Sequence, residues 1–302
     1  MMRAGACALL ALAVALTSST ASAFCRTRTC DLGDPAQDCQ IVDGCMMNGL
    51  PLFWPSACVS FGVQKDGSAL QAISYEQANQ VAIDSFLQWR NAACPEGGNP
   101  TIDVADFGKI SCHHPEYNQE APNANVIMFR DDWPYTEEDL VQGDTLALTT
   151  VTFNVETGEI YDADIEVNSQ GTDSLVANSA QVGADDIDLH SVLTHEIGHF
   201  LGLSHSRAPG ATMLPSLAPG QTSLATIEAD DIRGVCEIYP QDRMATTTSC
   251  VPRHGFSTAC AMEDTGCCTI APGARSSRTE PLALMLTALG LGLLGARRRR
   301  FG

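Results

Sequence analysis

The sequence predicts an α+β fold, because segments with strand periodicity are interspersed with segments of helical periodicity. Residues 58–63 alternate as in a half-buried strand, and further strands are expected at 101–107 and 125–129. A hairpin follows, with strands at 146–153 and 160–167 and a turn at 156–158. Helical spacing appears in residues 74–90 and in a histidine-rich segment at 195–205.

Both helices begin at recognisable capping residues. Ser74 followed by Gln77 is a capping box, and the first helix is expected to run to about Arg90. Its apolar positions recur at helical spacing: Ala78, Val81, Ala82, Phe86 and Trp89. Asp185, Asp186 and Asp188 precede the second helix, where negative charge is favourable and one carboxylate can act as the cap.

The strand at 160–167 is expected to have one apolar and one acidic face. Its apolar face consists of Tyr161, Ala163, Ile165 and Val167. Asp162, Asp164 and Glu166 point the other way, and we expect them to form an acidic surface in solvent.

The segment 195–205 reads His-Glu-Ile-Gly-His-Phe-Leu-Gly-Leu-Ser-His. On a helix, His195 and His199 lie about 6 Å apart along the axis on one face, so both can bind one ion. Glu196 lies beside that ion, and Gly202 ends the helix with a turn that brings His205 in as third ligand. Three nitrogen ligands predict a zinc site with one open position, and no organic cofactor is indicated.

The other histidines are predicted to lie away from this site. His190 is off the metal-binding face, and His113 and His114 lie in a loop beside Cys112. The alternative for 195–205, an amphipathic helix with core histidines, has to explain three histidines, a glutamate and a glycine in one register.

The pattern HExxHxxGxxH is the zinc signature of the metzincin metallopeptidases. Ser206 after the third histidine resembles the matrixin branch. Met213, in Ala-Thr-Met-Leu-Pro, resembles the family's Met-turn, and residues 229–239 resemble its closing helix. The resemblance covers roughly residues 51–240.

This resemblance implies a metzincin-like catalytic domain with a twisted mixed sheet, an antiparallel edge strand at 146–153, an active-site helix, a Met-turn and a C-terminal helix. Met213 would form a hydrophobic floor below the histidines, and Pro215 part of the wall of a substrate pocket. Leu217 stands where matrixins usually have an aromatic residue. The family's long propeptide with its switch cysteine is missing, so the Cys-rich segment before Leu50 is the one candidate for latency.

The predicted function is that of a zinc-dependent endopeptidase that hydrolyses peptide bonds of extracellular proteins, with Glu196 as the base that activates a zinc-bound water. One alternative is a catalytically weak, surface-displayed binding module on a metzincin shell. Another is hydrolysis of a non-protein amide by the same site.

The two ends of the chain have the composition of targeting segments. Residues 1–23 contain Arg3, an apolar run and Ala-Ser-Ala, as in a signal peptide. An apolar run at 281–296 is followed by four arginines at 297–300, and Cys267 and Cys268 precede it. This end resembles the myxobacterial C-terminal sorting tail, which implies an exported bacterial protein of the cell surface or medium that contacts the membrane transiently. We expect the tail to govern location and not catalysis.

The sequence divides accordingly into five parts. These are a signal peptide (1–23), a Cys-rich segment (24–50), the metallopeptidase domain (51–242), a Cys-rich linker (243–268) and the apolar tail (269–302). Ten of the 13 cysteines lie in the exported body outside the 267–268 pair, which predicts up to five disulfides. A second metal site is the alternative use of these cysteines.

The exported body is strongly acidic. Residues 24–268 contain 10 Lys and Arg against 35 Asp and Glu. Such a charge disfavours nucleic acid and anionic membrane surfaces as partners. It leaves protein or peptide substrates as the predicted partners and makes structural Ca²⁺ possible.

Overall fold

The computed structural model describes residues 24–32, 34–135, 145–172 and 174–260, and the backbone of a strand at 282–289. The predicted signal peptide, Cys267, Cys268 and the four terminal arginines lie outside the described residues. Among the helices that the structure describes, none has the length and apolar character needed to cross a membrane.

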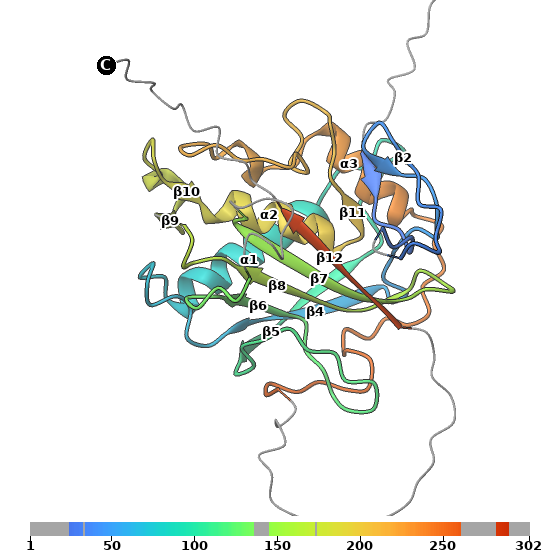
Figure 1. Ribbon diagram of the computed structural model, residues 1–302, viewed down its shortest axis with the longest axis horizontal. Coiled ribbons are helices and arrows are strands. Elements are labelled where there is room, and N and C mark those ends of the chain that lie inside the picture. Colours follow the sequence, from blue (N-terminus) through green and yellow to red (C-terminus); the bar gives the residue numbers. More distant parts are fainter. Residues whose placement is uncertain (1–23, 33, 136–144, 173, 261–281, 290–302) are drawn as a thin grey trace, which may run out of the picture.

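A mixed sheet forms the centre of the molecule (Figure 1). Its strands are β4 (Cys58–Gln64), β5 (Asp103–Ile110), β6 (Val126–Phe129), β7 (Ala147–Asn154), β8 (Ile160–Val167) and β12 (Leu282–Leu289), in the spatial order β12-β7-β8-β6-β4-β5. Strands β5, β4, β6 and β8 are parallel, whereas β7 is antiparallel to β8. The predicted mixed sheet is therefore confirmed, with the antiparallel β7 at the edge of the five strands β7, β8, β6, β4 and β5, and with β12 added outside it.

Strand β5 differs from its predicted bounds. It begins two residues later than expected and continues to Ile110, past Gly108. Gly108 has a positive φ of 83°, and the register with β4 shifts between Phe61 and Val63. This irregularity lets the strand continue through a glycine that interrupts the alternation in the sequence.

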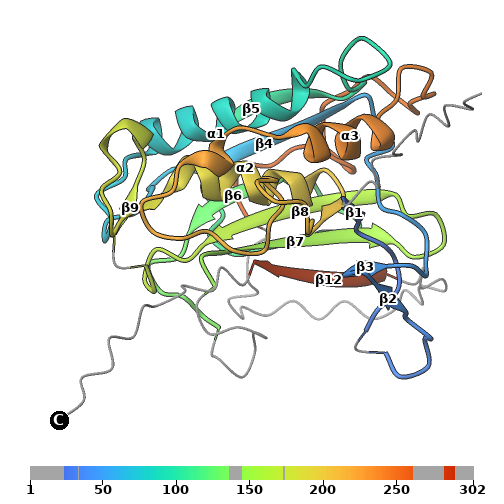
Figure 2. The ribbon, with the colours of Figure 1, turned by 90° about the horizontal axis from the view of Figure 1, so that it is seen from above.

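Helices α1 (Tyr75–Arg90) and α2 (Leu189–Phe200) pack against each other on one face of the sheet, α1 over β4 and β5 and α2 over β7 and β8. The capping box of Ser74 and Gln77 is confirmed, and so is a carboxylate cap on the second helix, where Asp188 accepts from the Ser191 N–H. Helix α3 (Ala229–Ile238) is the predicted closing helix (Figure 2).

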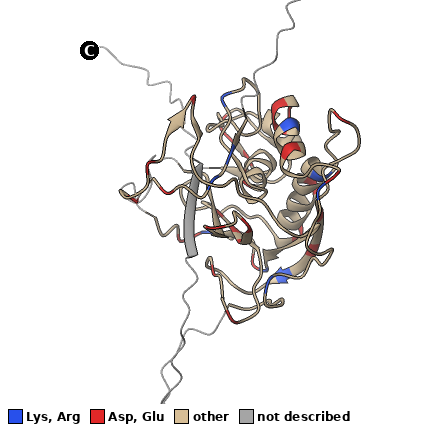
Figure 3. Ribbon diagram, turned by 90° about the vertical axis from the view of Figure 1, so that its right-hand side faces the viewer, with Lys and Arg blue, Asp and Glu red and all other residues tan. Residues whose placement is uncertain are grey.

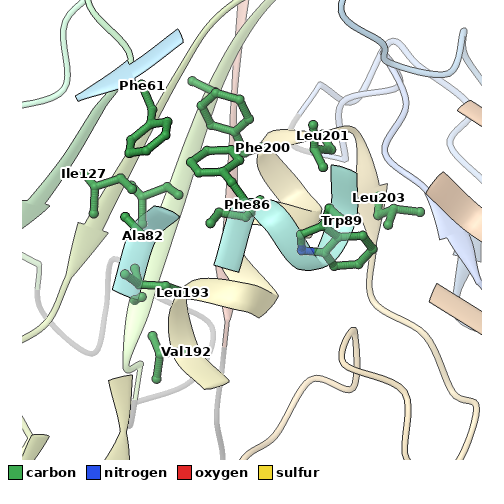
Figure 4. Packing of buried hydrophobic residues seen from close by; sticks show 14 of the residues in the cluster. Phe61, Ala82, Phe86, Trp89, Ile127, Val192, Leu193, Phe200, Leu201 and Leu203 are labelled. Carbon is green, nitrogen blue, oxygen red and sulfur yellow. The ribbon is translucent and has the colours of Figure 1, made fainter. Parts of the chain in front are cut away.

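Aromatic side chains fill the core between the helices and the sheet (Figure 4). Phe86 stacks on Phe61 with ring centroids 4.4 Å apart and meets Phe200 edge-on at 5.2 Å. Trp89 adds a polar link, because its indole N–H donates to the Thr194 carbonyl at 2.8 Å. The contacts of Phe200 and Thr194 fix the position of α2 against α1.

The acidic face of β8 is buried, contrary to the sequence-based expectation of a solvent surface. Asp162, Asp164 and Glu166 are 2%, 1% and 0% exposed. Asp164 accepts hydrogen bonds from the Val126 and Glu116 N–H groups. Glu166 accepts from the Tyr135 hydroxyl and from the guanidinium of Arg130. Segments remote in the sequence thus cover and pair these carboxylates, which a strand pattern alone does not reveal.

The ten cysteines of the described body form five disulfides, as predicted: Cys25–Cys45, Cys30–Cys39, Cys58–Cys250, Cys94–Cys236 and Cys112–Cys260. Two of them fasten residues 243–260, the start of the expected linker, onto the sheet. Arg243 adds hydrogen bonds to the carbonyls of Trp54, Ser56 and Thr101.

Asp and Glu are spread over loops and helix ends of the ribbon, whereas Lys and Arg are few (Figure 3).

Part of the C-terminal apolar run is a strand. Residues 282–289 form β12, which pairs antiparallel with the outer side of β7 along its whole length, from Leu282 opposite Asn154 to Leu289 opposite Ala147. The backbone of residues 282–289 therefore extends the sheet beyond β7 (Figures 1 and 2).

Candidate metal centre

Helix α2 carries His195, Glu196 and His199 on a segment that is buried throughout. Its C-terminal end is fixed by the Trp54 indole N–H, which donates to the Phe200 carbonyl at 2.8 Å. The chain then turns at Gly202, whose φ is +98°. A side chain there would be strained, and its Cβ would lie 2.7 Å from the Leu52 carbonyl oxygen. This turn returns the chain through β11 (Leu203–Ser204) to His205.

The three histidine side chains converge. One ligand atom from each of His195, His199 and His205 lies within 4.8 Å of the others. The Nδ1 atom of His195 lies 2.6 Å from the Thr212 carbonyl oxygen, and Nδ1 of His199 lies 2.9 Å from that of Leu203. Because a carbonyl only accepts, each Nδ1 carries the proton, and each neutral ring presents the lone pair of Nε2 to the site.

These Nε2 atoms lack a protein donor. Nε2 of His195 and Nε2 of His199 are 3.1 Å apart, and Nε2 of His205 is buried without a hydrogen-bond partner among the described residues. Facing lone pairs at this distance repel unless a cation lies between them. The arrangement therefore fits a Zn²⁺ ion held by three imidazoles with a fourth position left for water or substrate.

Burial keeps the three rings neutral. Desolvation lowers the pKa of His195 well below its usual value, that of His199 to about 3 and that of His205 to about 4. The neighbouring histidines lower the pKa of His195 and His199 further. Neutral imidazole is the form that binds a metal, so the site is prepared for one at neutral pH.

Glu196 lies on the same buried helix, and its carboxylate contacts strand β7. Thr149 of β7 donates its hydroxyl to Oε2 of Glu196 at 2.5 Å, while Oε1 has no partner among the described residues. Burial raises the pKa of Glu196 to about 8, and the hydrogen bond from Thr149 lowers it. The carboxylate thus has one oxygen held by the sheet and one oxygen available for proton transfer.

Met213 lies directly under the helix. A Cβ built on Gly198 would come within 2.2 Å of its sulfur, and the Met213 side chain is fully buried. Asp231 of α3 accepts from the backbone N–H groups of Thr212 and Met213 and so ties this turn to the closing helix. Pro215, predicted to line a pocket, is exposed.

Leu217 is buried, and Ser206 donates its hydroxyl to Asp230 at 2.7 Å. Ser206 therefore links the residue after the third histidine to α3. The same helix thus holds both the Met-turn and the end of the ligand segment.

A second group of potential ligands comprises Cys112, His114 and Cys260. Its two cysteines are joined in a disulfide, which removes their thiolates as ligands. His190 belongs to neither group. In the described part of the chain neither group contains a carboxylate, so Ca²⁺ remains a prediction without a located site.

Comparison with known proteins agrees with this geometry. Residues 112–240 match the model of the matrixin family. Metalloendoproteinase 2-MMP of Arabidopsis thaliana is 33% identical over 115 residues, which cover 35% of this chain and 27% of the relative. Metalloendoproteinase 1-MMP of the same plant is 51% identical over 53 residues, 18% of this chain and 14% of the relative.

Human neutrophil collagenase is 48% identical over 52 residues, 17% of this chain and 11% of that protein. The matched part of the chain spans less than a third of the length of each of these three relatives. With the family match and the α+β fold, these relatives support a metallopeptidase domain of the matrixin type in this chain.

Proposed function

We propose that this protein is a zinc-dependent endopeptidase that hydrolyses peptide bonds of extracellular proteins. The observation that carries the proposal is the convergence of three neutral imidazoles beside the buried Glu196 carboxylate. His195, His199 and His205 hold the zinc, and Met213 forms the apolar floor beneath them. The five disulfides fit an exported protein in an oxidising compartment.

When bound, zinc polarises the scissile carbonyl and lowers the pKa of water. Glu196 accepts the proton of the attacking water and later delivers it to the leaving nitrogen. The Thr149 hydroxyl holds one carboxylate oxygen, so that the other is directed to the reacting atoms. A cation beside Glu196 favours its ionised form and opposes the effect of burial on its pKa.

The substrate is proposed to bind as an added strand. Strand β7 runs beside α2 and contributes Thr149 to the site, so an extended peptide on its outer side would pass the zinc. Main-chain hydrogen bonds would then supply affinity, and pockets for side chains would supply selectivity.

Replacement of the proposed base tests the function. We expect Glu196→Ala to reduce cleavage of casein or gelatin by at least ~100-fold while zinc stays bound, because the imidazoles hold the ion and Glu196 handles the proton. His205→Ala, in contrast, is expected to lose zinc. Zinc content and cleavage are measured on the same preparations.

The wild-type protein separates the competing functions. Zinc binding without cleavage of any protein substrate would favour the binding module, and cleavage of small amides alone would favour the non-protein hydrolase. Near-normal turnover in Glu196→Ala would contradict the role assigned to Glu196.

A further inference from the structure

The Cys-rich segment at the start of the described chain contacts the connection between the second and third histidines. Strand β1 (Cys25–Arg26) pairs antiparallel with β11, with Cys25 opposite Ser204 and Arg26 opposite Leu203. The next residue, Thr27, donates its backbone N–H to the Gly202 carbonyl at 3.0 Å. The segment thus covers residues 202–204 from outside the matched part of the chain.

Thr27 also reaches the hydrogen bond that orients His199. Its hydroxyl donates to the Leu203 carbonyl oxygen at 2.7 Å, and the same oxygen accepts the Nδ1–H of His199 at 2.9 Å. Both Thr27 and Leu203 are buried. A carbonyl oxygen has two lone pairs, so the two donors fix its direction together.

The direction of this carbonyl matters because the same oxygen receives the His199 proton, whereas the pairing of β11 with β1 restrains the backbone on either side of it. Gly202, immediately before it, adopts a φ of +98°, a conformation that residues with a side chain rarely adopt. His205 follows two residues after Leu203. Rotation of the Leu203 peptide would therefore turn the ring of His199 and shift the backbone that delivers His205.

A disulfide holds Thr27 in place. Cys25–Cys45 closes the loop that carries the short hairpin of β2 (Ile41–Val42) and β3 (Cys45–Met46). The apolar side chains of β2 are exposed, so this hairpin adds little to the core. On the other side of Thr27, its carbonyl oxygen accepts a hydrogen bond from the Leu52 N–H at 2.8 Å. Thr27 thus lies between the cross-link at Cys25 and the hydrogen bond to Leu52, and both support its own bonds to Gly202 and Leu203.

We propose that Thr27, held by the Cys25–Cys45 disulfide, is a positioning residue for the metal centre: its hydroxyl fixes the Leu203 carbonyl that orients His199. This inference rests on the proposed zinc function. The Cys-rich segment then belongs to the metal centre, and an oxidised Cys25–Cys45 bond is a condition for full retention of zinc.

Zinc release from the full-length chain tests the proposal. Thr27→Val removes the hydroxyl and keeps the shape, and Thr27→Ser restores the hydroxyl. Loss of a direct hydrogen-bond partner of a ligand typically costs 10–100-fold in affinity, and Thr27 acts one bond further away. We therefore expect zinc to pass to an excess of a chromophoric chelator roughly 3–10-fold faster from Thr27→Val than from wild type, and at the wild-type rate from Thr27→Ser.

The disulfide provides a matched comparison. Removing the cross-link with Cys25→Ser/Cys45→Ser should accelerate zinc release as Thr27→Val does. Removing the neighbouring one with Cys30→Ser/Cys39→Ser should not, because none of the described residues between Cys30 and Cys39 pairs with β11. Thermal unfolding of the metal-free proteins checks that each variant is folded.

The outcomes separate this proposal from the proposed function. A wild-type protein that binds no zinc would overturn both. If wild type binds zinc and loses it on His199→Ala, but Thr27→Val releases zinc at the wild-type rate, the positioning role alone is wrong. Equally fast release from Thr27→Val and Thr27→Ser would also overturn it, since the hydroxyl would then be irrelevant.

Discussion

The hydroxyl of Thr149 contacts the carboxylate to which we assign proton transfer. It lies 2.5 Å from Oε2 of Glu196 and comes from the sheet, whereas Glu196 lies on α2. An orientation that depends on one hydrogen bond is easily lost, and small misplacements of a catalytic group are costly.

We expect Thr149→Val to lower kcat by about 10-fold or more, because Glu196 loses the donor that directs it. KM and zinc content should change little, since valine suits a strand and the imidazoles are untouched. Thr149→Ser should keep most of the activity. Steady-state kinetics with parallel zinc analysis measure the effect, and an unchanged kcat in Thr149→Val would contradict the assigned contact.

Asp162 and Asp164 form a buried pair of acids. Burial and the neighbouring Asp164 raise the pKa of Asp162 well above its usual value, and burial raises that of Asp164 to about 7. One oxygen of Asp162 has no hydrogen-bond partner among the described residues. The folded state therefore binds protons that the unfolded state has released by pH 5.

This difference predicts how stability depends on pH. The contribution of the pair to the free energy of unfolding is fully present below pH ~4, and it is lost as the pH rises toward and past 7. Asp162→Asn removes one of the two charges, so the variant should gain roughly 1–3 kcal/mol relative to wild type between pH 5 and pH 8. Urea unfolding in calcium-free buffer at both pH values measures this, and parallel pH profiles for the two proteins would refute it.

At the scale of elements, α2 packs closely against the turn that contains Met213, and the closest approach is at Gly198. A Cβ on Gly198 would lie 2.2 Å from the Met213 sulfur and 3.0 Å from Trp89. Two effects oppose each other on replacement by alanine. Higher helix propensity favours alanine by about 1 kcal/mol, whereas overpacking typically costs 1–3 kcal/mol.

We expect overpacking to prevail, because Trp89 and Met213 are both fully buried and have little room to move. Gly198→Ala should therefore reduce the free energy of unfolding by about 1–2 kcal/mol. The same substitution in a Met213→Ala background should cost less, since the sulfur is gone. Denaturant titration of the four proteins gives the coupling, and equal costs in both backgrounds would exclude the contact with Met213.

The sequence predicts those parts of the site that are local in the chain. His195, Glu196 and His199 share one helix, and Gly202 and His205 follow shortly after it, so their spacing alone brings them together. Thr149 lies on strand β7, 47 residues before Glu196, which it contacts. Thr27 lies in the N-terminal segment, 176 residues before Leu203, which it contacts. No periodicity encodes such contacts.

The same limit explains the buried acids of β8. Alternation separates the two faces of that strand correctly, but it cannot show what lies over them. Here Glu116 contacts Asp164, and Arg130 and Tyr135 contact Glu166, all on the acidic face. Contacts with other segments of the chain therefore decide burial where the local pattern suggests solvent.

For the whole molecule, the position of β12 goes against the expectation that the tail governs location alone. Its backbone lies along the outer side of β7, where Thr287 is opposite Thr149. We propose that protein substrates bind along this same side. A tail strand and a substrate strand cannot occupy it together.

A chain that ends after residue 268 should therefore bind peptide substrates more tightly than the full-length chain. We expect KM to fall by at least about 3-fold with kcat and zinc content unchanged, because the substrate no longer competes with β12. The full-length chain with Leu284→Pro/Met285→Pro is the matched control. Whichever of these two residues donates its N–H to β7, a proline there removes that hydrogen bond. Equal KM values for all three proteins would show that β12 leaves the edge in solution.

The pairing of β12 with β7 also affects whether molecules of this protein associate with one another. An uncovered β7 would present a row of unpaired N–H and C=O groups, the kind of edge through which sheets join. Within one chain, β12 covers that edge at every concentration, whereas two shortened chains could cover each other only when concentrated. Shortened chains without substrate should then self-associate as their concentration rises, and the full-length chain should stay monomeric along this edge.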